Sequence, residues 1–405
     1  MTFPTFLRAL NSRNYRLFFA GQGVSLMGNW MTTTASMWLV YELSGSAFYV
    51  GLVGFATQIP LLVLAPLTGV GGDRTDRRRR LVWLQVLSCL QSSALATLTL
   101  AGQMTVPVLI ALCVAQGLIN AWEFPTRQSF LVEMVSDKRD LPNAIALNSS
   151  AFNVARLAGP ALAGTLILAW GAGACYAIDA ASYLPVIGSL LAMRVPARPA
   201  RVAATRRLDD LREGLHHATH EPGLRRPLLM VAVNALAGFG ASILAPVFAA
   251  SVYHGDSRLL GHFYSSIGAG ALLSAAFLST RTDTDDLRRW VVRGAGLVGL
   301  GQAIFAASPS VGLAYGALMA TGFGTVLVMA GSNTLIQSRV DDDKRSRVMG
   351  LFAMGQGMFP VGSLLIGALA AASSPRLAVA TCAGVCLIAA AIYHRLKPTA
   401  ARQVR

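Results

Sequence analysis

The sequence is poor in charge, and this shortage narrows what the chain can be. Only 13% of its 405 residues are Asp, Glu, Lys or Arg, whereas 54% are hydrophobic. A soluble protein of this length would need a more charged surface. The hydrophobic residues gather in stretches of about 20, the length with which an α-helix crosses a bilayer core. Alternation with period two, typical of a transmembrane β-barrel, is absent. The sequence therefore predicts an all-α membrane protein.

Lysine is scarcer still, and its positions exclude one kind of energy source. The lysines are Lys138, Lys344 and Lys397, and none follows a glycine. The phosphate-binding loop G-x-x-x-x-G-K-[ST] is therefore missing, so the chain does not hydrolyse ATP by that route. The catalytic patterns H-E-x-x-H and G-x-S-x-G are missing as well. We expect neither an enzyme nor a cofactor.

The five cysteines are too few, and too scattered, to suggest disulfides or a metal site. All lie in predicted membrane spans and show no metal-ligand spacing, which favours simple packing: Cys89, Cys113, Cys175, Cys382 and Cys386. His216 and His220 have the i, i+4 spacing of metal ligands, but no cysteine is near them. We expect no bound metal.

Hydrophobic segments predict twelve transmembrane helices. The approximate limits are 15–41, 47–70, 81–101, 106–126, 142–169, 172–193, 227–252, 259–280, 290–308, 311–336, 347–371 and 376–393. With the N-terminus in the cytoplasm, nearly all of the 34 Lys and Arg fall on cytoplasmic segments. Only Arg258 and Arg376 fall outside, and Arg156 lies deep within a span. This asymmetry predicts that both termini are cytoplasmic, and it explains the net charge of +15 without nucleic acid.

The chain divides into two six-helix halves. Residues 1–194 form the first half, 195–226 a polar cytoplasmic linker, 227–394 the second half, and 395–405 a basic cytoplasmic tail. Each half leads from an acidic and basic loop into a fifth span with a proline, Pro160 in one and Pro360 in the other. Internal repeats of this kind are typical of secondary transporters.

A charged run between spans two and three carries a family resemblance. Residues 69–78 read GVGGDRTDRR, which resembles the loop signature G-x-x-x-D-R/K-x-G-R/K-R/K of the major facilitator superfamily. Asp76 replaces the second glycine, as in the drug- and siderophore-exporting branch with the enterobactin exporter and macrolide efflux proteins. The matching residues are Gly69, Asp73, Arg74, Asp76, Arg77 and Arg78.

Further stretches resemble the same branch in the same order. They are 43–47 (LSGSA), 120–128 (NAWEFPTRQ), 141–149 (LPNAIALNS), 153–160 (NVARLAGP), 333–337 (NTLIQ) and 345–350 (RSRVMG). Residues 159–164 (GPALAG) partly match the G-P-x-x-G-G motif of antiporters, with Ala163 in place of a glycine. The resemblance implies the major facilitator fold, with an exporter driven by proton antiport. An importer or uniporter of a small organic solute in the same fold is the alternative.

The loop signature has two interpretations. Asp73 could stabilise the N-terminus of span eleven near Ser346, and with Arg74 and Arg77 latch the two halves on the cytoplasmic side. Otherwise the basic residues only set the topology. We favour the latch. Helix packing or kinking is expected from Gly159, Pro160, Gly164 and Pro360.

Charges inside the spans are the candidates for proton coupling, because an ionised group at mid-membrane needs a partner or water. Glu123 and Arg127 have i, i+4 spacing on span four, so Glu123 either couples protons or forms a structural pair. Asp179 on span six is the second candidate, and we expect it to pair with Arg156 on span five.

Polar and aromatic residues on the spans that line the cavity by resemblance are substrate candidates: Asn29, Trp30, Thr33, Asn120, Asn234, Phe239 and Asn333. This sparsely polar set suits a small amphipathic compound. We expect a monomeric, multi-pass protein of the cytoplasmic (inner) membrane. Its partners would be lipid, protons and a small-molecule substrate, with no nucleic acid.

Overall fold

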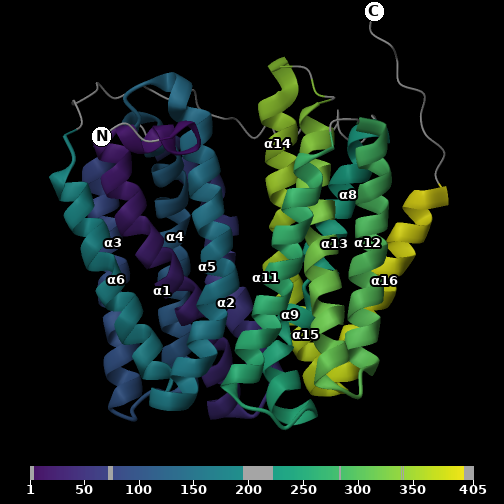
Figure 1. Cartoon of the computed structure of the whole chain (residues 1–405). Helices are drawn as coiled ribbons and strands as arrows, with labels where there is room; N and C mark the ends of the chain where they lie inside the picture. The colour runs from purple at the N-terminus through teal and green to yellow at the C-terminus, as the bar shows by residue number, and fades with distance from the viewer. Residues whose placement is uncertain are drawn as a thin grey trace, which may run out of the picture. The chain divides into compact units, whose positions relative to one another are not determined.

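The computed structural model describes residues 4–71, 76–194, 222–281, 284–338, 340 and 342–395, and the regular structure in these ranges is helical (Figure 1). The predicted latch residues Asp73 and Arg74, residues 195–221 of the predicted linker and residues 396–405 of the tail lie outside them, whereas residues 222–226 of the predicted linker already belong to a helix. The chain divides into two compact units. Unit 1 comprises the described residues of Met1–Gly45, Ala56–Thr205 and His254–Ser265. Unit 2 comprises those of Ser46–Phe55, Arg206–Tyr253 and Ser266–Arg405.

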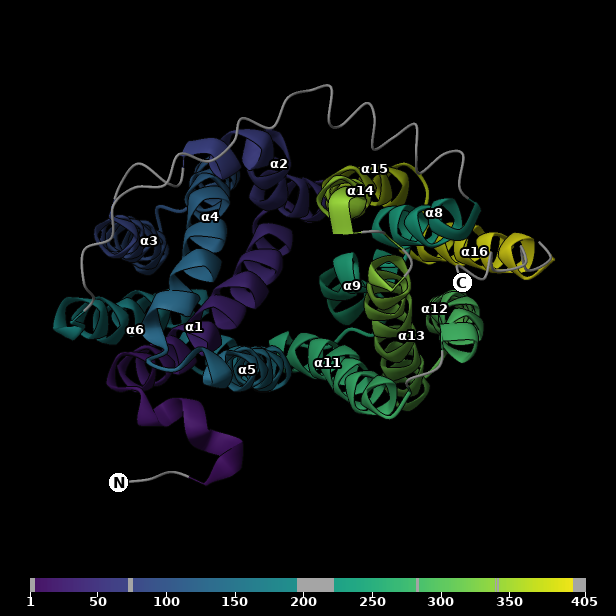
Figure 2. The ribbon, with the colours of Figure 1, turned by 90° about the horizontal axis from the view of Figure 1, so that it is seen from above.

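Unit 1 is built mainly from the first six long helices. Its elements are η1 (Thr5–Asn11), α1 (Arg13–Ser44), most of α2 (Ala47–Gly71), α3 (Arg77–Leu100), α4 (Val106–Met134), η3 (Lys138–Asp140), α5 (Leu141–Trp170) and α6 (Ala172–Ala192). Helix α1 packs against α4, α5 and α6, and α3 lies against α4 and α6 (Figure 2). This arrangement brings one face each of α1, α3, α4 and α6 into the interior of the unit.

Unit 2 contains the later helices, two of whose spans are interrupted. Its elements are α8 (Pro222–Ala237), α9 (Gly240–Ile243), α10 (Ala245–Val247), the π-helical turn η4 (Phe248–Val252), most of α11 (Ser257–Ser279), α12 (Thr284–Ala307), α13 (Val311–Gln337), α14 (Asp342–Gln356), α15 (Phe359–Ala372) and α16 (Pro375–Arg395). Helix α12 packs against both α13 and α16 (Figure 2). Elements α8, α9, α10 and η4 together form span seven.

Eleven segments of the described chain are long and apolar enough to cross a membrane. They correspond to predicted spans two to twelve. Helix α1 is not among them, although its 32 residues exceed the required length. The physical reason is its polarity, since Gln22, Ser25, Thr34 and Ser36 on its buried face lower its hydropathy.

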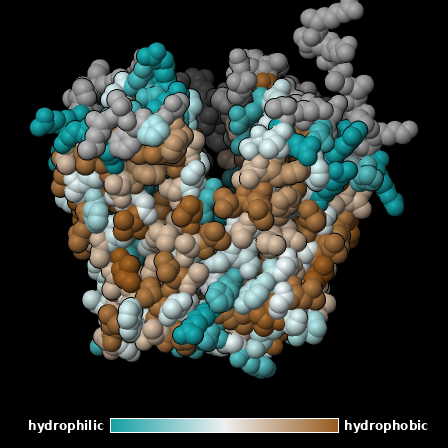
Figure 3. Space-filling model, viewed as in Figure 1, coloured by the Kyte–Doolittle hydropathy of each residue, from teal (hydrophilic) through white to brown (hydrophobic). Residues whose placement is uncertain are grey.

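The exposed and buried faces show the reversed polarity of a membrane protein. On α3, Trp83, Leu87 and Leu90 are exposed at helical spacing, whereas Gln85 and Ser88 are buried. In the view of Figure 3, hydrophobic residues occupy most of the middle of each unit, while hydrophilic residues gather mainly at its upper edge. A lipid-facing exterior explains the exposed hydrophobic side chains. The interior is left free to hold polar groups.

Two long helices are shared between the units, and hydrogen bonds show how each short portion is held. The start of α11 packs on α5 in unit 1, where the Ser257 hydroxyl donates to the Gly164 carbonyl at 2.8 Å. A Cβ on Gly261 would lie only 2.5 Å from the Pro160 carbonyl oxygen, so glycine permits this close approach. The start of α2 belongs to unit 2, where Ser363 donates to the Gly51 carbonyl at 2.9 Å.

Several predicted details are corrected by the backbone. Span four was expected to end at residue 126, but α4 continues through Pro125 to Met134. Pro360, for which helix packing or kinking was expected, does not lie inside a continuous helix: it stands in the first turn of α15, where its missing N–H costs nothing, after a break at Gly357 and Met358. Pro160, in contrast, lies inside the continuous helix α5.

Candidate functional site

The described part of the loop signature anchors α3 inside unit 1. The Asp76 carboxylate accepts hydrogen bonds from the backbone N–H groups of Arg78 and Arg79, at 2.9 and 3.3 Å, and so caps the N-terminus of α3. Arg77 forms a 2.7 Å ion pair with Glu133 on α4. Of the remaining signature residues, Gly69 lies in α2.

Arg78 binds the C-terminal end of α6. Its Nε donates to the Leu190 carbonyl and its Nη2 to the Leu191 carbonyl, both at 2.6 Å. These carbonyls belong to the last turn of a helix, where no intrahelical N–H is available to them. Arg77 and Arg78 therefore join three helices of the same unit, a role that the sequence did not reveal.

Asp179 is buried where α1, α3 and α6 meet. Its side chain is 1% exposed. Its Oδ2 accepts hydrogen bonds from Ser92 on α3 at 2.7 Å and from Thr32 on α1 at 2.9 Å. Its Oδ1 has no hydrogen-bond partner in the described part of the chain. A Cβ on Gly28 would lie 2.5 Å from Oδ1, so this glycine makes room for the carboxyl group.

Arg156 does not neutralise Asp179. No ion pair joins these two residues, and Nε of Arg156 has no hydrogen-bond partner among the described residues. The expected pairing is therefore not observed. Similar predicted depths on α5 and α6 were a poor guide, because the Asp179 carboxyl turns toward the hydroxyls of α1 and α3.

Glu123 forms the expected pair with Arg127 and also contacts α3. Its Oε1 lies 3.3 Å from Arg127 Nη1 and accepts a hydrogen bond of the same length from Gln85 Nε2. The Glu123 side chain is 14% exposed and that of Arg127 is 21% exposed. The Glu123 side chain is thus partly exposed, whereas Asp179 is fully buried.

Tyr183 adds a phenol hydroxyl to the same interior. Its hydroxyl donates to Asn29 Oδ1 at 3.2 Å, and it lies beside the Ser88 and Ser92 hydroxyls. It interacts electrostatically with both Asp179 and Glu123. Helix α4 adds further polar groups, since Gln116 Nε2 donates to Asn120 Oδ1 at 3.0 Å and to Ser88 Oγ at 3.4 Å.

These side chains form one polar cluster inside unit 1. The polar cluster is Asn29, Thr32, Gln85, Ser88, Ser92, Gln116, Asn120, Glu123, Asp179 and Tyr183. Sequence reasoning found the two carboxylates, Asn29 and Asn120. It missed Gln85, Ser88, Ser92, Gln116 and Tyr183, although a buried carboxyl in lipid requires hydroxyl or amide donors, and several of these residues lie at helical spacing on α3.

The other substrate candidates of unit 1 make local contacts. Thr33 donates to the Asn29 carbonyl of its own helix at 2.9 Å. The Trp30 ring packs edge-on against Phe152 at a centroid distance of 5.8 Å. A Cβ on Gly159 would lie 2.6 Å from Trp30 Cβ, so Gly159 lets α5 approach α1 closely.

The candidates of unit 2 lie in different settings. Asn234 is 3% exposed, and its amide atoms have no hydrogen-bond partner among the described residues. Phe239 packs edge-on against Phe359 at a centroid distance of 5.1 Å. Asn333 accepts a 2.6 Å hydrogen bond from Gln337 on the same helix.

Span seven is broken at Gly238 and Phe239, and a side chain from α12 repairs the break. In an unbroken helix the Ala237 carbonyl would accept from the Ala241 N–H. Gln302 is inserted instead: its Nε2 donates to the Ala237 carbonyl and its Oε1 accepts from the Ala241 N–H, both at 3.1 Å. Gln302 is fully buried. Its amide thus replaces one peptide hydrogen bond inside the unit.

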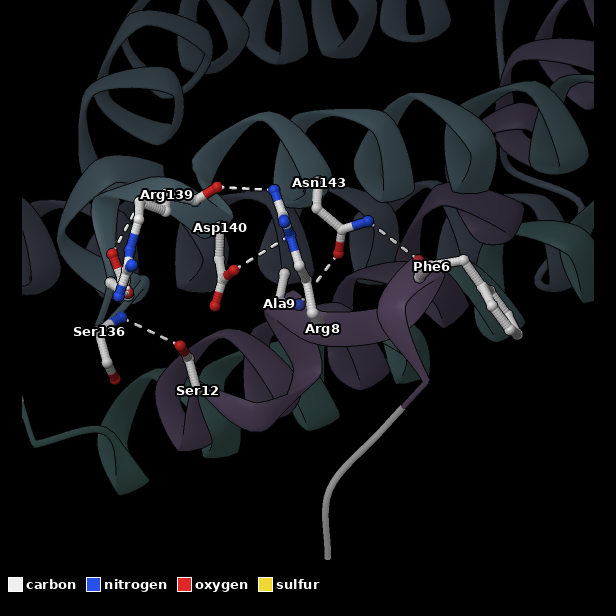
Figure 4. Close-up of polar contacts among 9 residues, drawn as sticks. Phe6, Arg8, Ala9, Ser12, Ser136, Arg139, Asp140 and Asn143 are labelled. Atoms are coloured by element: carbon white, nitrogen blue, oxygen red, sulfur yellow. Dashed lines mark hydrogen bonds and ion pairs between the residues drawn. The ribbon is translucent and has the colours of Figure 1, made fainter.

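The N-terminal arm is fastened to the start of α5 (Figure 4). Asn143 accepts from the Ala9 N–H and donates to the Phe6 carbonyl, both at 3.0 Å. Arg8 forms a 3.1 Å ion pair with Asp140 and donates to the Arg139 carbonyl at 2.8 Å. Ser12 accepts from the Ser136 N–H at 3.0 Å. The arm and this loop therefore form one bonded layer at the end of unit 1.

A salt bridge within the same loop makes Asp137 more acidic. Arg139 donates a side-chain hydrogen bond to the Asp137 carboxylate at 2.9 Å and also contacts it through its backbone N–H. The side-chain bond is the larger cause of a pKa for Asp137 below its usual value. The carboxylate therefore remains charged at neutral pH.

Interrupted spans and polar groups in a membrane-spanning interior are features of secondary transporters, and the major facilitator superfamily is the group of these transporters to which the chain belongs. The chain belongs to the transmembrane secretion effector family within it, whose model matches residues 5–403.

Known relatives cover most of the chain. It is similar to the staphyloferrin A transporter of Staphylococcus aureus, with 25% identity over 87% of this chain and 88% of the relative. It is similar to the multidrug efflux pump Tap of Mycolicibacterium fortuitum, with 26% identity over 85% of this chain and 86% of the relative. The expected exporter branch is thereby confirmed.

The fold also matches solved structures. A bacterial homologue of the iron transporter ferroportin, in an inward-facing state, superimposes with a TM-score of 0.72. The match covers 94% of this chain and 98% of that protein at 16% sequence identity. At this identity the likeness concerns the fold alone.

Proposed function

We propose that the protein exports a small amphipathic organic compound, of the siderophore or drug-like class, in exchange for protons. The observation that carries the proton coupling is the polar cluster, in which Glu123 and Asp179 lie among hydroxyl and amide groups in the interior of unit 1. The relatives support the substrate class, because one transports staphyloferrin A and another is a multidrug efflux pump.

Glu123 is the entry point for protons in this proposal. It is partly exposed, and its single bonded oxygen is shared by Arg127 and Gln85. Protonation would weaken the pair with Arg127, because the attraction requires the charged carboxylate. Arg127 would then be free to contact another group. A carboxyl with two alternative partners is suited to linking proton binding to a change of state.

The substrate contacts are proposed for both units. Asn29, Asn120 and Trp30 would contribute from unit 1, and Asn234, Phe239 and Asn333 from unit 2. Amides supply a few directional hydrogen bonds, and the aromatic rings supply apolar area. Such a lining favours a bulky amphipathic compound over a polyhydroxylated one.

Efflux from proteoliposomes with an imposed pH gradient tests the proposal. The substrate panel contains carboxylate and catecholate siderophores, macrolides and lipophilic cations. We expect accumulation of at least one class that collapses when the gradient is dissipated. Glu123→Gln should abolish the dependence on the gradient while leaving binding measurable. Transport that ignores the proton gradient would overturn the antiport.

The cytoplasmic latch is a second part of the proposal. Asp73, with Arg74 and Arg77, would act on the start of span eleven, whose first helix, α14, begins at Asp342. Asp73→Asn should slow transport without lowering expression. Arg79→Gln, which removes a charge from the same basic run, serves as the control. Unchanged turnover of the Asp73 variant would refute the latch, and the loop would then only set the topology and anchor α3.

Transport in the opposite direction is the alternative. An importer or uniporter would use the same fold, and the family alone does not set the direction. The proposed setting is a monomer in the cytoplasmic membrane with both termini in the cytoplasm. Inside-out and right-side-out vesicles distinguish the two directions, since only an exporter accumulates substrate in inside-out vesicles when their lumen is acidic.

A further inference from the structure

Asp179 is a buried carboxyl group that structural packing alone leaves incompletely bonded. One of its oxygens accepts two hydroxyl hydrogen bonds, whereas in the described chain the other has nearby only the Ser182 hydroxyl, which donates to the backbone carbonyl of Asp179 itself. A buried polar atom without a partner is costly, and an ionised carboxyl in such a place is more costly still. The group therefore calls for an explanation beyond stability.

We propose that Asp179 is an exchangeable proton-binding site, connected to Glu123 through Ser92 and Tyr183. The inference rests on the proposed proton-coupled function and deepens it. Glu123 would take up the proton at the more open position, and Asp179 would store it in the interior. The unit would thus contain two proton sites in series.

The surroundings of Asp179 favour a neutral acid. From α1 it faces Gly28 and the Thr32 hydroxyl, and from α3 the Ser92 hydroxyl. Its own helix contributes the Ser182 hydroxyl, the Cys175 thiol and the Tyr183 phenol, which are also uncharged when protonated. From α5, Arg156 forms no ion pair with it. With no cation facing the carboxylate in the described chain, a bound proton is what removes its charge.

Hydroxyl groups provide a route between the two sites. Ser92 lies 2.7 Å from Asp179 Oδ2, and Tyr183 lies beside Ser88 and Ser92. A hydroxyl both donates and accepts, so it can receive one proton and release another without a net change. One proton leaves the Glu123 carboxylic acid, and one reaches the Asp179 carboxylate.

Tyr183 is the central residue of this route. Its phenol interacts electrostatically with both carboxyl groups. It now donates to Asn29, and a rotation of its O–H toward Ser92 would open the route. Tyr183 acts as a positioning and relay residue, and its removal should change the rate of proton exchange more than the fold.

Infrared spectroscopy of the purified protein in lipid tests the proposal without any substrate. A protonated Asp179 gives a carboxylic C=O stretching band that should disappear in Asp179→Asn. If that variant does not fold, Thr32→Val assigns the band instead, because losing a donor to Oδ2 shifts its frequency. We expect the band to decrease as the pH is raised.

The route is tested by the rate at which this band shifts after transfer to heavy water. A positioned proton-transfer group contributes about 10²–10⁴-fold, so we expect Tyr183→Phe to slow the exchange by about 100-fold. Tyr176→Phe is the matched control. Tyr176 is a buried tyrosine of the same helix that bonds Ser36, outside the polar cluster. In the Tyr176→Phe variant, the band should shift in heavy water at the wild-type rate.

The outcomes separate this inference from the proposed function. If no band belongs to Asp179, or if the band ignores pH, the proton site is refuted even where export is proton-coupled. If Tyr183→Phe exchanges as fast as the wild type, the route is refuted. If the band titrates but export does not depend on protons, the site stands and the antiport fails.

Discussion

The carboxylate of Asp76 accepts a 2.9 Å hydrogen bond from the backbone N–H of Arg78, and this bond begins α3. At this position the broad superfamily signature has a glycine. The substitution is thus a helix cap, not a loss of the motif. Asp76 also places Arg77 and Arg78 in the first turn, where they reach α4 and α6.

The cap predicts a modest and specific loss of stability. Asp76→Ala should lower the free energy of unfolding by about 0.5–2 kcal/mol, because two N–H groups lose their acceptor. Thermal unfolding in detergent measures the change. Asp76→Asn retains an acceptor oxygen and is the control. If the asparagine variant is as unstable as the alanine variant, charge matters more than capping.

Arg78 should not be replaceable by lysine. A single ammonium cannot reproduce the two guanidinium bonds to Leu190 and Leu191. We expect Arg78→Lys to destabilise unit 1 by about 0.5–1.5 kcal/mol, the net value of one hydrogen bond. Arg79→Lys, at an exposed neighbouring position, should be neutral. Equal melting temperatures for both variants would show that the α6 contact contributes nothing.

Asn143 should control the mobility of the N-terminal arm. Asn143→Ala removes its bonds to Ala9 and Phe6, and each is worth about 0.5–1.5 kcal/mol. We therefore expect backbone exchange in η1 to become about tenfold faster, as measured by hydrogen–deuterium exchange mass spectrometry. In the control Asn153→Ala, the lost bond lies within α5 alone. Unchanged protection of η1 would contradict the prediction.

Gln302 should hold the break in span seven together. Gln302→Leu leaves the Ala237 carbonyl and the Ala241 N–H unbonded in the interior, at about 1–3 kcal/mol for each group. The melting temperature should fall, and exchange at residues 238–244 should rise. Ser332→Ala is the control, because that buried hydroxyl has no hydrogen-bond partner in the described chain. If Gln302→Leu matches this control, the bridge is dispensable.

Particular residues show how far sequence reasoning reaches. The spans follow from hydropathy, and the Glu123–Arg127 pair follows from helical periodicity. The Arg156–Asp179 pair was expected from depth alone and is not formed, because depth does not fix the direction in which a side chain points. The role of Gln302 left no signal, since its partners are backbone atoms of a distant helix.

The sequence by itself determined the membrane character and the helical class, and its motifs indicated the exporter branch. Hydropathy and short motifs are properties of contiguous stretches of sequence, so they can be read without knowing which helices pack together. The tertiary structure decided which polar groups meet. Asp179 finds Thr32 and Ser92 only when α1, α3 and α6 pack together, and the orientation of these helices depends on interior packing over the whole unit. The polar cluster therefore forms only in the folded unit, although each of its residues can be identified in the sequence.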